Sequence, residues 1–212
     1  MKLIIKYFLT LLLVTTALPA SAGAYEDMTR AIGMGDNSTV ANLLRKGFDV
    51  NTVDKEGDTL LIMAAKEGNV NVIKTLLAAK PRVTALNSFG ESALMLASIK
   101  GHLEVVKILL AEGAQIDHAG WTPLIYAASM NQLDVMRLLI VRGAKIDAAN
   151  ASGLTALMLA AREGQAQAVL LLMEYGANVN TKASNGYSAL MAAKQRNNDE
   201  ISRILLKAGA KE

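Results

Sequence analysis

The phrase GLTALMLAA at residues 153–161 decides the fold, because four close variants of it occur in the same chain. The other copies are GDTLLIMAA from Gly57, GESALMLAS from Gly90, GWTPLIYAA from Gly120 and GYSALMAAK from Gly186. Successive opening glycines are 33, 30, 33 and 33 residues apart. A nearly constant period of this length is typical of a solenoid, in which each unit buries its apolar face only against its neighbours.

Each copy predicts a pair of helices separated by a tight turn. A hydroxyl residue two positions after the glycine is suited to cap the first helix, and these residues are Thr59, Ser92, Thr122, Thr155 and Ser188. A residue type that tolerates left-handed backbone follows the first helix, at Gly68, Gly101, Asn131, Gly164 and Asn197. The second helix has apolar residues at helical spacing, as in Val105, Val106, Leu109 and Leu110, and a glycine such as Gly113 follows it.

From about Ala31 onward the chain resembles the ankyrin-repeat family, whose pattern joins this phrase to a Gly-His turn, a Val-Val-x-x-Leu-Leu helix and a Gly-Ala pair. The resemblance implies an all-α fold, an ankyrin-repeat solenoid of stacked helix–turn–helix units with short β-hairpin fingers. It also implies a concave face made by the finger tips and the first helices. The segment from Met28 to Asn51 keeps both helices without the opening phrase, as expected of a capping unit.

The chain divides into an export signal and one repeat domain. Residues 1–22 combine Lys2 and Lys6 with an apolar run and small residues, which predicts a signal peptide cleaved after Ala22 or Ala24. The alternative is an uncleaved membrane anchor, although the apolar run is short for a span. In the ankyrin-repeat domain at 25–212 we expect an N-terminal capping unit at about 25–52, full repeats at about 53–85, 86–117, 118–148 and 149–181, and a C-terminal capping unit at about 182–212.

The chain departs from the family pattern at three places. The family's histidine after leucine, which hydrogen-bonds neighbouring loops, is replaced by Ile62, Met95, Ile125, Met158 and Met191. Lys80 and Pro81 replace the usual Gly-Ala, and because the residue before proline disfavours the helical region, the helix there is predicted to end early. The short step between Gly90 and Gly120 predicts a truncated finger with a notch beside it.

The composition argues against an enzyme and against several classes of partner. The chain has no cysteine, and its two histidines are His102, expected to be structural, and His118, which has no second ligand nearby in sequence. No catalytic or nucleotide-binding motif is present, so we expect no enzyme activity, no cofactor and no metal. Loss of Lys2 and Lys6 leaves 20 basic against 19 acidic residues, which offers no basis for nucleic-acid binding or, after cleavage, for membrane association.

Apolar residues at positions where the concave face should be polar predict the site of a protein partner. These candidate partner-binding residues are Phe89, Ile99, Trp121, Met130, Leu154 and Tyr187. The alternative is that each one packs against its own neighbour and contributes stability. Repetition across four units, and the weight of Trp and Tyr in interfaces, favours binding.

The sequence therefore predicts a non-enzymatic protein-binding module, monomeric and located in the bacterial periplasm. Its family resemblance implies roles such as stress protection or inhibition of a toxic protein. Two alternatives stay open, which are a secreted effector that binds a host protein and a hydrolase with an unrecognised site.

Overall fold

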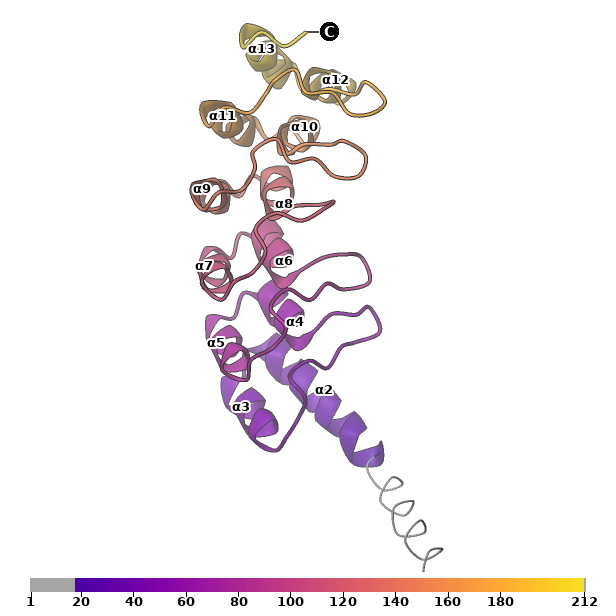
Figure 1. Ribbon diagram of the computed structural model, residues 1–212, viewed down its shortest axis with the longest axis vertical. Helices are drawn as coiled ribbons and strands as arrows, with labels where there is room; N and C mark the ends of the chain where they lie inside the picture. The colour runs from indigo at the N-terminus through magenta and orange to yellow at the C-terminus, as the bar shows by residue number, and fades with distance from the viewer. Residues whose placement is uncertain (1–17, 212) are drawn as a thin grey trace, which may run out of the picture.

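The computed structural model describes residues 18–211 and consists of a single stack of helix pairs. The described helices are α2 (Leu18–Met34), α3 (Asn37–Arg45), α4 (Leu60–Glu67), α5 (Val70–Ala78), α6 (Ala93–Lys100), α7 (Leu103–Ala111), α8 (Pro123–Ser129), α9 (Leu133–Val141), α10 (Ala156–Arg162), α11 (Ala166–Glu174), α12 (Ala189–Gln195) and α13 (Asp199–Lys207). Figure 1 shows the even-numbered helices in one column and the odd-numbered helices in a second column beside it. We call these the inner and outer helices. The all-α repeat prediction is confirmed.

The sequence determines where each inner helix begins. The hydroxyl oxygens of the five predicted capping residues each accept a hydrogen bond from the backbone N–H three residues later. The side chains that follow are almost wholly buried, for example Leu94 and Leu157. Because the alanine pairs at the centre of these helices are also buried, neighbouring inner helices approach closely and form one continuous core.

A short loop, here called a finger, projects before each inner helix from α4 onward (Figure 1). The fingers are numbered one to five along the chain and lie in the loops at residues 46–59, 79–92, 112–122, 142–155 and 175–188, of which the third is three residues shorter than the others. Isolated antiparallel bridges close four of them, namely Val53 with Thr59, Leu86 with Ser92, Ala149 with Thr155 and Lys182 with Ser188. Within the described residues finger three has no such bridge, which agrees with its predicted truncation.

One recurring set of hydrogen bonds between units comes from the middle turn, whereas the position of the family's histidine holds apolar residues. A polar side chain at the start of an outer helix forms a hydrogen bond with a carbonyl oxygen near the C-terminal end of the inner helix in the preceding unit. The pairs are His102 with the Lys66 oxygen at 3.2 Å, Gln132 with Ile99 at 3.2 Å, Gln165 with Ser129 at 3.3 Å and Asn198 with Ala161 at 2.8 Å. His102 therefore has the expected structural position, and these bonds couple successive units.

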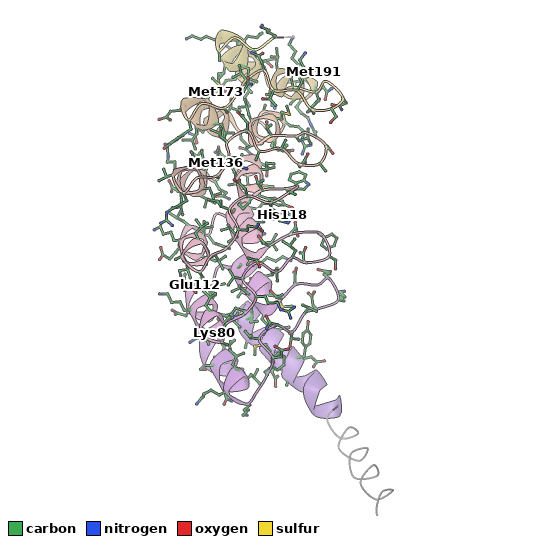
Figure 2. The ribbon with its side chains drawn as sticks, in the orientation of Figure 1. Lys80, Glu112, His118, Met136, Met173 and Met191 are labelled. Carbon is green, nitrogen blue, oxygen red and sulfur yellow. The ribbon has the colours of Figure 1, made fainter. Side chains whose placement is uncertain are left out.

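The prediction that the helix before Pro81 ends early is wrong. Helix α5 ends at Ala78 and has nine residues, like α7 and α9. Lys80 lies beyond the C-cap Ala79 and adopts a left-handed φ of 55°. Because proline restricts only the residue directly before it, the restriction falls outside the helix and leaves its length unchanged. Figure 2 shows Lys80 on the outer-helix side.

The predicted signal peptide falls mainly on residues outside the described part of the chain, and it stays a prediction. Both predicted cleavage points lie in α2, and from residue 23 onward the first buried residue of that helix is Met28. Cleavage at either point would therefore leave the buried residues from Met28 onward in place. None of the helices described between residues 18 and 211 is long and apolar enough to cross a membrane.

Replacement of Ser202 by alanine is expected to stabilise the protein by about 1 kcal/mol. Ser202 is 8% exposed in α13, at the position that Val106 and Val169 occupy in other outer helices, and its hydroxyl has no hydrogen-bond partner. Urea unfolding followed by circular dichroism measures the gain. The control is Ser98→Ala, because the Ser98 hydroxyl donates to the Leu94 carbonyl oxygen at 2.7 Å. Equal effects of the two substitutions would contradict the argument.

Candidate protein-binding face

The fingers and the inner helices share one side of the stack, and this side carries all six residues that the sequence singled out. The structure places three of them in solvent, where Phe89 is 71%, Met130 52% and Trp121 36% exposed. The other three are half-buried and pack against the core: Ile99, Leu154 and Tyr187. The exposed three offer contact area to a partner, whereas the half-buried three also contribute to packing.

The truncation of finger three leaves open space beside finger two. A Cβ atom added to Gly57 would lie 3.0 Å from the backbone nitrogen of Ser88 in the next finger, and one added to Gly153 would lie 2.9 Å from the Ala183 Cα. A Cβ atom added to Gly90 would meet nothing within 4 Å. Gly90 therefore has no close neighbour in finger three, which agrees with the notch predicted from the spacing.

A hydrogen-bonded network runs from this notch towards the N-terminal end of the face. The Trp121 and Tyr126 rings stack with their centroids 5.3 Å apart, and the Tyr126 hydroxyl donates to Glu91 Oε1 at 2.7 Å. Asn87 Nδ2 donates to Glu91 Oε2 at 3.1 Å and to Asp58 Oδ1 at 2.7 Å. The network therefore joins three successive units through side chains.

Sequence reasoning missed Tyr126, Asn87 and the role of Glu91 in this network. A signal for Tyr126 was available, because the same position of the other units holds Met63, Leu96, Leu159 and Ala192. A hydroxyl-bearing ring in an otherwise aliphatic position indicates a polar partner. The partner itself, Glu91, is 35 residues away in the sequence and could not be identified from the pattern.

The electrostatics of the network follow from its burial. Burial of the Tyr126 ring, together with its hydrogen bond to Glu91 and the charge of that carboxylate, raises the pKa of Tyr126 well above its usual value. Tyr126 therefore stays protonated and keeps donating to Glu91 across the physiological range. The Lys66 ammonium lies 3.9 Å from the buried Asp58 carboxylate and balances the charge at the other end.

A group of carboxylates lies in finger one, where oxygens of Asp54, Glu56 and Asp58 are within 4.8 Å of one another. Asp54 Oδ1 accepts from the backbone nitrogens of Glu56 and Asp58, both at 2.8 Å. Asp58 is held by Asn87 and Lys66, as described above. These bonds account for the cluster as part of a finger turn, and we assign it no metal.

His118 lies in surroundings without a neighbouring carboxylate partner among the residues that line its cavity. It lines a very small cavity beside the notch with Thr84, Leu86, Ser92, Met95 and Gln115, a described set that contains no carboxylate. Figure 2 shows His118 at the middle of the stack. The neighbouring Asp117 carboxylate accepts from the Lys145 backbone nitrogen instead.

A family model described as ankyrin repeats in three copies matches residues 28–119, 80–150 and 142–212. The chain belongs to the ankyrin-repeat family. Members of this family typically bind proteins without catalysis. Comparison with curated protein sequences finds no match.

Among solved structures, the ankyrin-repeat chain is similar to a chain in the complex of the Bd0816 predatory endopeptidase from Bdellovibrio bacteriovorus with immunity protein Bd3460. The two chains are 31% identical with a TM-score of 0.76, over 85% of this chain and 97% of the other. The similar protein is the immunity protein rather than the enzyme. The likeness supports a protein-binding module with a protein partner.

Proposed function

We propose that this chain is an exported ankyrin-repeat inhibitor that acts in the periplasm, where it binds a hydrolytic enzyme through its finger side and blocks it. The observation that carries the proposal is the similarity to the complex of an immunity protein with an endopeptidase, which extends over nearly the whole of that chain. The signal-like residues 1–22 support an exported location. The exposed Phe89, Trp121 and Met130 supply the apolar contact area that a stable interface requires.

The proposal is tested by capture followed by an activity measurement. The chain without residues 1–24 is immobilised and exposed to periplasmic extract, and the retained proteins are identified by mass spectrometry. Each retained hydrolase is then purified and assayed with increasing amounts of the soluble chain. The proposal requires stoichiometric loss of hydrolysis. Retained partners that have no hydrolytic activity, or that keep it in the presence of the chain, would exclude inhibition and leave a binding module alone.

Replacement of Trp121 by alanine is expected to weaken binding of the captured partner about tenfold or more, because aromatic anchors dominate interface energies. The cost to the free chain is expected to be only about 1 kcal/mol, since Trp121 is partly exposed and what it loses is its stacking on the ring of Tyr126. Surface plasmon resonance measures the affinity and urea unfolding the stability.

The control for this substitution is Val141→Ala. Val141 is 72% exposed on the outer helix α9, so its truncation should leave the affinity unchanged. A partner that binds the Trp121 and Val141 variants equally well would place the interface elsewhere.

A further inference from the structure

Glu91 is a carboxylate without a compensating cation. Its two recorded side-chain partners, the Tyr126 hydroxyl and the Asn87 amide, are both neutral. Among residues 18–211 no lysine or arginine forms an ion pair with it, whereas the nearby Asp58 is balanced by Lys66. An ionised carboxylate offers about four acceptor positions, so Glu91 retains acceptor capacity beyond these two bonds. Glu91 is partly exposed, so that capacity is accessible from solvent.

An aromatic surface adjoins this carboxylate through a shared neighbour. Tyr126 contacts Glu91 with its hydroxyl and Trp121 with its ring face. Trp121 is 36% exposed, and it lies in finger three, next to the loop of Gly90, where an added Cβ atom would meet nothing within 4 Å. A tryptophan face beside a carboxylate is suited to a planar cation, which stacks on the ring and donates to the oxygens at the same time.

The wider charge distribution favours a basic segment at this end of the face. The finger and inner helix of the first full unit carry the acidic residues Asp54, Glu56, Asp58 and Glu67 against Lys55 and Lys66. The last unit carries Lys182 on its finger and Arg196 directly after its inner helix, and residues 182–196 contain no acidic residue. A partner that lies along the stack is therefore attracted with its basic part towards Glu91.

Resting on the proposed binding of a protein partner, we propose that Glu91, Trp121 and Tyr126 form a receptor for an arginine side chain of that partner. The guanidinium group stacks on the exposed face of Trp121 and donates to the free acceptor positions of Glu91. Tyr126 is a positioning residue, because its hydroxyl orients the carboxylate while its ring supports the tryptophan. Arginine fits better than lysine since a planar fork matches both a ring face and a carboxylate.

The single tryptophan of the chain is Trp121, so its fluorescence reports on this site alone. The chain without residues 1–24 is titrated with a blocked tri-arginine peptide and with the same peptide made from citrulline, the neutral isostere of arginine. We expect a saturable change of Trp121 emission with tri-arginine, and affinity about tenfold lower for tri-citrulline. Raising the salt concentration from about 0.02 M to about 0.5 M should weaken the tri-arginine interaction.

Two variants test whether tri-arginine binding depends on the charge of Glu91. Glu91→Gln removes the charge while an amide in the same place retains partners in Tyr126 and Asn87, and it should reduce tri-arginine binding to the tri-citrulline level. Glu112→Gln makes the same charge change at the outer-helix side (Figure 2) and should bind tri-arginine like the unaltered chain. Circular dichroism checks that both variants fold. If Glu91→Gln unfolds the chain, the comparison with the citrulline peptide and the salt dependence test the arginine receptor without this variant.

Equal responses to the arginine and citrulline peptides, or no saturable response of Trp121, would overturn the arginine receptor. A hydrolase that is inhibited equally by the Glu91→Gln and unaltered chains would overturn it too, while leaving the proposed inhibition intact. Selective binding of tri-arginine without any inhibited enzyme would have the opposite meaning, because the receptor would stand and the proposed function would fail.

Discussion

Replacement of Asn87 by aspartate is expected to destabilise the protein by about 2–4 kcal/mol at neutral pH. Asn87 is buried, and its Oδ1 accepts from the backbone nitrogens of Phe89 and Glu91. Aspartate retains these acceptor bonds. It loses the donor Nδ2, and it puts a third carboxylate between Asp58 and Glu91. The expected loss comes from this charge repulsion, and urea unfolding measures it.

The same variant should depend on pH in a defined direction. Crowding of three carboxylates raises their pKa values in the folded state, because each charge disfavours the next. Protonation of one carboxyl group relieves the repulsion and restores a donor, so the deficit should shrink as the pH falls below about 5 and grow as it rises.

The matched control is Asn150→Asp in finger four. Asn150 Oδ1 accepts from the backbone nitrogens of Ser152 and Leu154 in the same way, but no carboxylate partner is recorded for its amide. Finger one already has an aspartate, Asp54, at the equivalent position. The control substitution should therefore cost little. If both substitutions cost the same, the bridge between Asp58 and Glu91 contributes nothing to stability.

Replacement of Gly153 by alanine is expected to cost about 2–4 kcal/mol, again measured by urea unfolding. Gly153 has a φ of +80°, which disfavours any side chain, and its added Cβ would lie 2.9 Å from the Ala183 Cα in finger five. Because that neighbour is backbone, fingers four and five must shift apart to make room.

Gly90→Ala separates the penalty of left-handed backbone from the penalty of the close contact between fingers. Gly90 has nearly the same backbone conformation, with a φ of +76°, but its added Cβ would have no neighbour within 4 Å. It should cost only about 1 kcal/mol, the penalty of left-handed backbone alone. Equal losses at the two glycines would contradict the close contact between fingers four and five.

Much of the fold could be predicted from local signals. The hydroxyl residue before each inner helix and the glycine or asparagine after most of them determine the helix pairs, because capping and left-handed turns are local properties. The error at Lys80 had a local cause as well, because Pro81 restricts only Lys80, which lies beyond the C-cap of the helix.

The candidate site was less predictable because it depends on contacts between units. The sequence indicated which residues lie on the finger side, but not that Ile99, Leu154 and Tyr187 would be half-buried there. That outcome depends on how much of each side chain the next unit covers. Their role in partner binding stays a prediction.

The sequence by itself determined the repeat period, the helix caps, the truncated finger and the residue types offered to a partner, because each is written within one unit. Only the tertiary structure decided that Tyr126 meets Glu91, that Asn87 joins Glu91 to Asp58, and that the Gly153 backbone touches finger five. Apart from the Asn87–Glu91 bond within finger two, these contacts join residues about one repeat apart. They depend on the side-chain geometry of stacking between units, which a pattern of residue types along one chain does not contain.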